Sequence, residues 1–463
     1  MSGVSCFRTL STEQQGHRTL LLEARERFGG RSCTETVGGL AVDTGGQWLG
    51  RCHTKMLSLC DELGLEVEEQ NFPAAVFAEG EPPALIEMAF YKLKASSPEA
   101  EKELAAFQER LAEAYRRLCS EAVEPNELAE WDRLSILDVI TSECSCAGAI
   151  EDLSYFVQTV LAVDPEHCSY LFLLHYVFCW GGGERGMDLL GDGPDGLQAL
   201  KVKGGVQQIT ERLVMLAQGE VNTDCRTVLG VAVEGIGYDA QRDVVTVTAR
   251  TTAGTSVLYS CKRVVLALSP TLMRHMTFSP PSLISDDRRR LWDSMRMGSA
   301  VKVICVFEHS FWRHRHQHEA GGGLGISEVG IVSNIFESSL GDLPALICLI
   351  TGKNARLYSS LTREEREASV LKQIQLMYAQ GFAPPIHYIE KDWCAEERSG
   401  GCYAAIVGPT PDAVFFTHGA LLRESIVEGK VFVAGTEAST LFYGYLEGAA
   451  RKGEDVAKKL LKI

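Results

Sequence analysis

The chain has 463 residues, more than one ordinary core holds, because single domains usually contain roughly 100–200 residues. Hydrophobic residues make up 45% of it and charged residues 23%, which excludes a disordered chain or a collagen-like fibre. The net charge of −16 disfavours nucleic acid and anionic membranes as partners, although a local basic cluster can still hold a small anion.

In chain order, the first half predicts a strand over 19–22, a strand over 36–43, a helix over 97–118, a helix pair over 164–180 and a glycine-rich loop over 181–196. The second half predicts a hairpin arm over 244–248, a strand over 261–268, strands over 302–307 and 345–351 in a different sheet, a strand over 430–434 and a helix over 446–461. The last helix places Leu446, Ala450, Ala457 and Leu461 on one face, with Glu454 and Lys458 spaced for an ion pair.

Strands of similar character thus occur near the start, in the middle and at the end, with helices and other strands between them. This order predicts an α/β fold with a discontinuous nucleotide-binding domain that a substrate lobe interrupts.

Cysteine usage predicts an intracellular protein. The chain has 15 cysteines, an odd count, scattered from Cys6 to Cys402 without the spacing of zinc ligands, so we expect reduced thiols and no metal site. The first residues lack the apolar segment of a signal peptide, and the longest apolar run, 170–180, is shorter than the about 20 residues that span a bilayer. We expect a soluble protein without a transmembrane segment, in the cytoplasm or an organelle lumen.

An acidic residue and a basic, glycine-containing segment follow the first strand. In dinucleotide-binding βαβ units, an acidic residue at the end of the second strand binds the ribose, roughly 20 residues after the phosphate-binding glycines. Glu23 stands at this position, although a Glu after three leucines is common in other folds. Three arginines within seven residues, Arg25, Arg27 and Arg31, can neutralise a pyrophosphate. A solvated basic turn would leave the pair Gly29-Gly30 unexplained.

Here the sequence resembles the flavin-containing amine oxidase family, most closely its monoamine oxidase branch. The matching segments, in the family's order, are 22–31, 43–50, Gly204-Gly205, Ser269-Pro270, 297–302, 393–403 and 434–448. The resemblance implies an FAD-binding Rossmann-like domain of the glutathione-reductase type, formed by 1–75, 198–282 and 388–463. It also implies an inserted α+β substrate-binding domain formed by 76–197 and 283–387.

The chain departs from the family pattern at its beginning. Counting back from Glu23, the family's phosphate-binding glycines fall at about positions 1–5, with a whole strand before them. Because the sequence begins at Met1-Ser2-Gly3, we expect the first parallel strand and its main pyrophosphate contacts to be absent. This truncation puts flavin affinity in question.

The resemblance implies a covalent flavin and an aromatic cage. It assigns Cys402 as the thiol that bonds the 8α-methyl group of FAD, where a lone cysteine is otherwise a small buried hydrophobe. Tyr403 and Tyr445 correspond to the pair of rings that steers the amine, since electron-rich faces attract an ammonium group. Core packing is the ordinary role of a tyrosine. Leu441-Phe442-Tyr443 replaces the family's His-Trp-Ser, so the support of the cage differs, and Tyr443 is a competing tyrosine.

Further roles follow from the same resemblance. Lys302 would hold a water against the flavin N5 and assist reaction with oxygen, and Trp393 would pack along the isoalloxazine ring; a surface lysine and a core tryptophan are the ordinary alternatives. The other expected cofactor contacts are Glu23, Arg25, Arg31, Gly45, Gly46, Gln47, Trp48, Val231, Gly435, Thr436, Glu437, Tyr445 and Leu446.

The expected reaction is oxidative deamination of a primary or secondary amine by FAD, with oxygen as acceptor and release of ammonia and hydrogen peroxide. One alternative is a polyamine or amino-acid oxidase of the same fold, although no arginine in the cage motifs can hold a substrate carboxylate. A second alternative is a flavin-free homologue that acts as a binding protein. A homodimer is a further expectation from the family.

Overall fold

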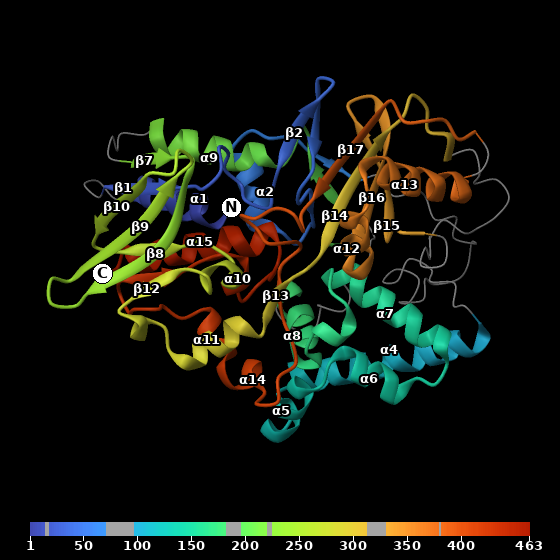
Figure 1. Ribbon diagram of the computed structural model, residues 1–463, viewed down its shortest axis with the longest axis horizontal. Helices are drawn as coiled ribbons and strands as arrows, with labels where there is room; N and C mark the ends of the chain where they lie inside the picture. The colour runs from blue at the N-terminus through green and yellow to red at the C-terminus, as the bar shows by residue number, and fades with distance from the viewer. Residues whose placement is uncertain (14–17, 71–96, 182–195, 220–224, 313–329, 379–380) are drawn as a thin grey trace.

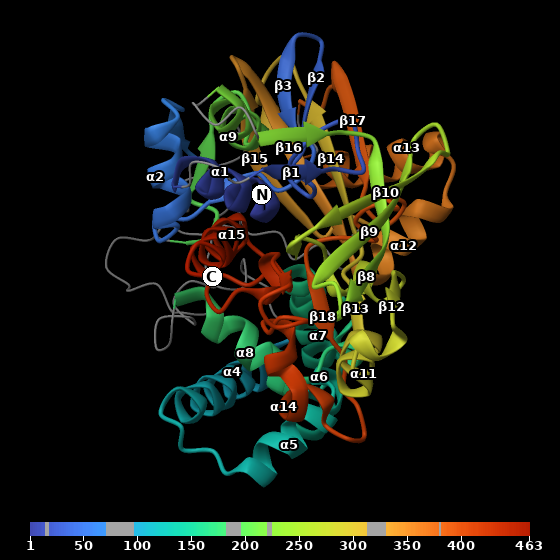
Figure 2. The ribbon, with the colours of Figure 1, turned by 90° about the vertical axis from the view of Figure 1, so that its left-hand side faces the viewer.

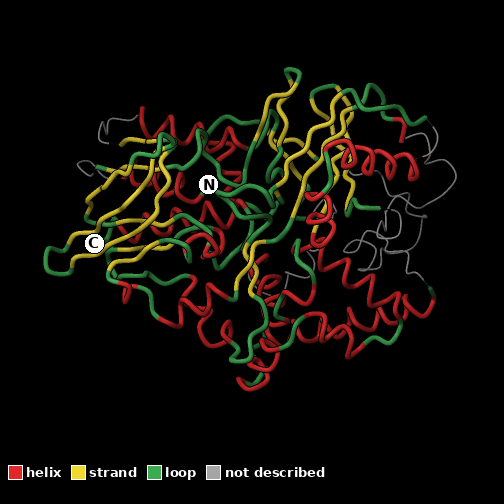
Figure 3. Tube along the Cα trace, viewed as in Figure 1, coloured by secondary structure: helices red, strands yellow, loops and turns green. Residues whose placement is uncertain are grey.

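The computed structural model describes residues 1–13, 18–70, 97–181, 196–219, 225–312, 330–378 and 381–463. Figure 1 shows two groups of strands side by side, and Figure 3 shows helices between the two groups and below the second one. The predicted loop over 181–196 lies almost wholly outside the described residues. None of the described helices is both long and apolar enough to cross a bilayer.

Two pairs of parallel strands join distant parts of the chain. Strand β1 (Thr19–Leu22) pairs with β7 (Cys225–Val228), and β11 (Val264–Leu266) pairs with β19 (Val431–Val433). The start, middle and end of the sequence therefore meet, which confirms the predicted discontinuous α/β arrangement.

Helix α1 (Ser2–Glu13) lies across both parallel pairs. On one side, Phe7 packs with Cys225 of the β1–β7 pair, and on the other, Cys6 packs with Phe432 of the β11–β19 pair. Gly3 is a point of close approach, because a Cβ added there would lie 3.2 Å from the Cβ of Ala267. A glycine at this turn is what close packing of a helix on a sheet requires.

The two parallel pairs leave a slot between them. No described strand pairs with the inner edge of β1 or of β11. Consecutive residues 19–23 and 264–268 line the same cavity, so the strand edges themselves border it. The Val264 N–H donates to Lys430 O, and because bonding direction alternates along a strand, the backbone of Val265 turns towards the slot. Among the described residues, no strand therefore occupies the position between β1 and β11.

Two further sheets flank this region. The first has the order β10 (Ser256–Cys261), β9 (Val244–Thr251), β8 (Val231–Asp239), β12 (Thr277–Ser279). The second has the order β15 (Asn334–Leu340), β16 (Leu343–Thr351), β14 (Ala300–Val306), β17 (His387–Asp392). The predicted strands over 302–307 and 345–351 thus lie next to each other in a separate sheet, as expected.

Helices form the opposite end of the molecule, below the second sheet in Figures 1 and 2. They are α4 (Pro98–Cys119), α5 (Pro125–Arg133), α6 (Ile136–Glu143), α7 (Ala147–Leu161) and α8 (Tyr170–Gly181). Ser97 caps the predicted helix over 97–118 by accepting the Ala100 N–H at 3.1 Å. Apolar side chains of α4, α7 and α8 belong to one continuous core.

The remaining strands are β2 (Thr34–Val37), β3 (Leu40–Asp43), β4 (Trp48–Leu49), β5 (Val67–Glu69), β6 (Leu200–Val202), β13 (Met295–Met297) and β18 (Ala405–Val407). The remaining α-helices are α2 (Thr54–Glu62), α9 (Gln207–Gly219), α10 (Pro270–Met273), α11 (Asp286–Asp293), α12 (Gly352–Ser360), α13 (Arg363–Tyr378), α14 (Val414–His418) and α15 (Leu446–Leu460). The α15 prediction is confirmed, with Ala450 and Ala457 fully buried and a Glu454–Lys458 ion pair of 2.7 Å.

Three predicted elements differ from the structure. The strand over 36–43 is a hairpin, because Gly38 and Gly39 take left-handed φ angles of 58° and 81° that turn the chain. The helix pair over 164–180 is a 3₁₀ turn (Pro165–His167) followed by α8. The strand over 261–268 is interrupted, since β10 ends at Cys261 and β11 begins at Val264.

Joining an apolar, β-branched strand and a short glycine turn ahead of Met1 should stabilise the protein. Such a strand can fill the slot and bond to the edges of β1 and β11, and we expect the melting temperature to rise by roughly 5 °C. Thermal unfolding followed by circular dichroism measures this change. A glycine–serine extension of equal length is the control, and equal melting temperatures for both proteins would contradict an open strand position.

Candidate functional site

A single cavity of about 1910 Å³ brings nearly all the predicted site residues together. It extends from the slot, past the carboxyl ends of the parallel strands, to the second sheet. The predicted residues that line it are Glu23, Arg25, Arg31, Gly45, Gly46, Gln47, Trp48, Val231, Lys302, Trp393, Cys402, Tyr403, Gly435, Thr436, Tyr445 and Leu446. Two of the predicted residues, Glu437 and Arg27, do not line it.

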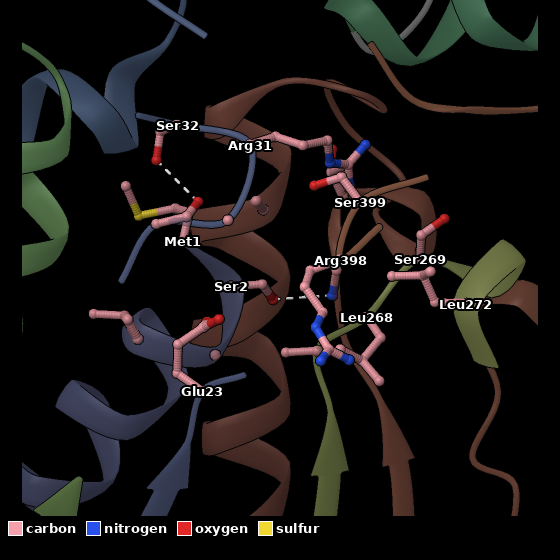
Figure 4. A pocket seen from close by; sticks show the side chains of 18 of the residues that line it. Met1, Ser2, Glu23, Arg31, Ser32, Leu268, Ser269, Leu272, Arg398 and Ser399 are labelled. Atoms are coloured by element: carbon pink, nitrogen blue, oxygen red, sulfur yellow. Dashed lines mark hydrogen bonds between the residues drawn. The ribbon is translucent and has the colours of Figure 1, made fainter. Parts of the chain in front are cut away.

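The end of the cavity near the parallel strands carries the acidic residue predicted to bind a ribose. Glu23 follows β1, and its carboxylate accepts the Arg25 N–H at 2.9 Å. The Arg25 guanidinium donates to Ser399 Oγ at 2.8 Å and lies 3.3 Å from Glu396. Figure 4 shows Glu23, Ser2 and Arg398 around this space. Arg25 therefore lines the cavity while already held by neighbouring side chains.

Arg27 does not line the cavity, contrary to the idea that three arginines together face an anion. Its guanidinium donates to Ser32 O and Gly30 O, both at 2.9 Å, and so closes the loop on itself. The loop places Gly30 against the cavity with a φ of 63°, and a Cβ there would meet no atom within 4 Å. A ligand can thus approach this backbone closely.

Arg31 connects three segments of the site. Its guanidinium donates to Tyr403 O at 2.8 Å and forms an ion pair of 2.8 Å with Glu437. Burial opposes the charge of Arg31, but the Glu437 carboxylate raises the pKa of Arg31 above its usual value. The Glu437 side chain is thus an internal anchor and contributes no side-chain surface to the cavity.

The turn after β19 borders the same end of the cavity. The Gly435 N–H donates to Ser2 Oγ at 3.0 Å, which ties the turn to the first residues of α1. Thr436 Oγ donates to Tyr445 O at 3.0 Å and fixes the approach to α15. The strand–turn–helix segment therefore presents backbone to the cavity and orients Tyr445. Val231 lies nearby, where its N–H donates to Glu23 O at 2.9 Å.

Lys302 is a buried cation in the middle of the cavity wall. It lies on β14, only 4% exposed, and its Nζ donates to Gln47 Oε1 at 2.7 Å and to Gly45 O at 3.1 Å. Its Nζ also lies 5.2 Å from the ring centre of Trp48. Burial lowers the pKa of Lys302 to about 8, although Asp43 opposes this shift. The structure excludes the alternative of a surface lysine.

Cys402 lies in a tight turn beside Trp393. Gly401 has a φ of 135°, and a Cβ there would collide with Gly298 O, while the Cys402 N–H donates to the same oxygen at 2.9 Å. Burial raises the pKa of the Cys402 thiol to about 12, so the free thiol is protonated at neutral pH. Trp393 donates its indole N–H to Thr44 O at 3.0 Å and packs in one cluster with Cys402.

Tyr403 and Tyr445 both reach the cavity, whereas Tyr443 does not. Tyr443 is 1% exposed, and its hydroxyl donates to Ala405 O at 2.7 Å. It packs against Phe172 in the helical core, so Tyr445 lines the cavity and Tyr443 does not.

Several further residues that line the cavity are not among the predicted site residues. They come from α7, α8 and β15 and comprise Tyr155, Phe156, Thr159, Val160, Tyr176, Trp180, Asn334, Ile335 and Phe336. Among these described residues, none carries a charged side chain. For the α7 residues, the available sequence signal is an apolar face at helical spacing. This pattern does not distinguish a residue that lines a cavity from one that is buried in the core.

The regions of this chain that match known proteins include all the residues of the site. A family model described as flavin containing amine oxidoreductase matches residues 1–461. The chain is similar to amine oxidase (flavin-containing) A of Sus scrofa, at 27% identity over 100% of this chain and 83% of that protein. It is also similar to amine oxidase (flavin-containing) B of Homo sapiens, at 28% identity over 100% of this chain and 84% of that protein.

Solved structures with similar folds include cyclohexylamine oxidase from Brevibacterium oxydans, at 25% identity and a TM-score of 0.80, covering 100% of this chain and 96% of that one. A putrescine oxidase bound to putrescine shares the fold at 22% identity with a TM-score of 0.77, covering 100% and 97% of the two chains.

Proposed function

Because the chain belongs to the flavin-containing amine oxidoreductase family, we propose that it binds FAD and oxidises a primary or secondary monoamine, with oxygen as the electron acceptor. The observation that carries this proposal is the meeting of Lys302, Trp393, Cys402, Tyr403 and Tyr445 on one cavity. Under this proposal, 1–75, 198–282 and 388–463 form the FAD-binding domain, and 76–197 and 283–387 form the substrate-binding domain.

The residues present fit FAD. The cavity of about 1910 Å³ exceeds the usual range of ligand sites, roughly 300–1000 Å³, and so has room for a dinucleotide and an amine. Glu23 would accept hydrogen bonds from the ribose, and Gly30 and Gly435 would let the pyrophosphate approach the backbone. Trp393 and Lys302 would border the flavin ring.

FAD, when bound, accepts two electrons from the amine, which leaves an imine that water hydrolyses to a carbonyl compound and ammonia, and oxygen is then reduced to hydrogen peroxide. The contribution of this chain is to orient the amine and exclude water. Tyr403 and Tyr445 would attract the approaching ammonium group and then enclose the neutral amine between apolar faces.

The walls favour a monoamine with an uncharged body. A diamine requires a carboxylate for its second cation, and an amino acid requires a guanidinium for its carboxylate. The described cavity residues of α7, α8 and β15 supply neither group. We therefore favour the monoamine over the polyamine and amino-acid alternatives.

Purified protein should be yellow and should release hydrogen peroxide when mixed with an uncharged-body amine such as benzylamine. Absorbance near 450 nm and a coupled peroxidase assay measure the two properties. A protein reconstituted with excess FAD provides the upper reference for flavin content. A colourless protein that also fails to bind added FAD would favour the flavin-free binding protein instead.

Cys402→Ala should convert a covalently held flavin into one that acid extracts. Cys402 lies at the cavity wall beside Trp393, and the resemblance to the monoamine oxidase branch implies a bond from its sulfur to the 8α-methyl group of FAD. Acid precipitation of the parent should leave the colour in the pellet, whereas the variant should release it. Cys394→Ala, on a nearby thiol that does not line the cavity, is the control. Equal release by parent and variant would rule out the covalent bond.

Lys302→Met should slow the reaction with oxygen by roughly 100-fold and the anaerobic reduction by amine far less. Two of the three N–H donors of Lys302 bond to protein oxygens, and the third can hold a water near the flavin. Because the pKa of Lys302 is about 8, the positive charge is present below pH 8 and is lost above it. The oxygen reaction of the parent should therefore decline through that range, while the variant stays flat. Stopped-flow absorbance measures both steps, and equal slowing of both would contradict this role.

A further inference from the structure

A buried imidazole lies behind the cage tyrosine. His53 precedes α2, is fully buried and does not line the cavity. The Gly50 N–H donates to His53 Nδ1 at 2.9 Å, which places the single ring proton of the neutral imidazole on Nε2. Burial, together with Arg451, lowers the pKa of His53 to about 3, so the ring is neutral at physiological pH.

The Nε2–H group of His53 has aromatic neighbours in place of an oxygen acceptor. Nε2 is buried and has no hydrogen-bond partner among the described residues. The imidazole lies 4.9 Å from the ring of Phe442 at an interplanar angle of 84°, and 5.6 Å from the ring of Tyr445 at 59°. A buried N–H without any acceptor is costly, and the π-electrons of an aromatic face offer a weak one.

We propose that His53 is a positioning residue, whose Nε2–H contact with the Phe442–Tyr445 ring pair fixes the orientation of Tyr445 in the cage. This inference rests on the proposed function of Tyr445 as a wall of the amine site. The Tyr445 ring also lies 6.0 Å from the ring of Trp180 at an interplanar angle of 86°, so the tyrosine contacts both an imidazole and an indole.

The backbone around Phe442 supports this arrangement. Phe442 has a left-handed φ of 54°, its N–H donates to Cys179 O at 2.6 Å, and its carbonyl accepts the Tyr445 N–H at 3.0 Å. A non-glycine residue in this conformation persists only where its surroundings hold it. The ring of Phe442 therefore has a fixed place against which the imidazole can pack.

A buried carboxylate fixes His53 relative to Tyr445. Glu447, fully buried near the start of α15, accepts the N–H groups of Lys55 at 3.0 Å and Met56 at 2.7 Å. These N–H groups belong to the first turn of α2, directly after His53, while α15 begins directly after Tyr445. The two helix starts are thus joined, and the imidazole cannot move away from the cage independently.

The kinetic test compares two substitutions of His53 in flavin-loaded protein. His53→Phe keeps a flat ring but removes both the acceptor for Gly50 and the donor, and we expect kcat/KM for benzylamine to fall about tenfold with flavin content retained. His53→Gln supplies an acceptor and a donor again and should recover to within about threefold of the parent.

Leu59→Ala is the matched control, since Leu59 is buried in α2, the helix that follows His53, and lies outside the cavity. It should lower the melting temperature but leave kcat/KM per bound flavin unchanged. An unchanged kcat/KM in His53→Phe, or an equal loss in Leu59→Ala, would overturn the inference.

A spectroscopic test needs no amine turnover and so separates this inference from the proposed function. In protein labelled with 15N-histidine, the His53 imidazole N–H proton should resonate upfield through aromatic ring currents and stay constant between pH 5 and 8. Phe442→Leu and Tyr445→Leu should each shift it downfield. A resonance at the ordinary position, or one that ignores both substitutions, would refute the contact even if amine oxidation is observed.

Discussion

One ion pair, Arg31–Glu437, holds the parts of the site in register. Arg31 follows the loop after β1, Glu437 follows the turn after β19, and the same guanidinium binds the carbonyl of Tyr403. Segments more than 370 positions apart in the sequence are thereby fixed to one planar group. Because Glu437 is almost completely buried, loss of Arg31 would leave an uncompensated charge, a change that typically costs about 3–5 kcal/mol.

Burial is the main cause of the pKa shifts at the reactive end of the cavity and next to it. Burial raises the pKa of Cys402 to about 12 and lowers the pKa of Lys302 to about 8 and that of His53 to about 3. Each shift favours the uncharged form of its group. Of these three groups, only Lys302 changes its charge near neutral pH. None of the three carries a negative charge there, so none would retain a protonated amine by charge attraction.

Local sequence patterns predict most of the helices and strands, but they do not predict which distant residues come into contact. The period of α15 and the apolar strands around Lys302 were evident, since each depends on neighbouring residues in the chain. The pattern around Gly38-Gly39 predicts one strand, because a pair of glycines inside an alternating pattern fits a continuous strand as well as a hairpin. The family resemblance placed most cavity residues, but the pairing of Glu437 with Arg31 depends on two side chains that only the folded chain brings together.

The position of His53 shows the same limit. A histidine before a helix has no signature in sequence that distinguishes a support of the active site from an ordinary core residue. The role that we propose for His53 depends on its contacts with the rings of Phe442 and Tyr445, nearly 400 positions later in the sequence.

The inward-facing edges of β1 and β11 also bear on how this protein behaves outside its native state. Unpaired edges at a molecular surface invite association with other chains, whereas these are sheltered by α1 on one side. A fluctuation that lifts α1 would uncover both at once. Self-association of the protein should therefore begin with local detachment of its first helix, well before the second sheet and the helical end lose their structure.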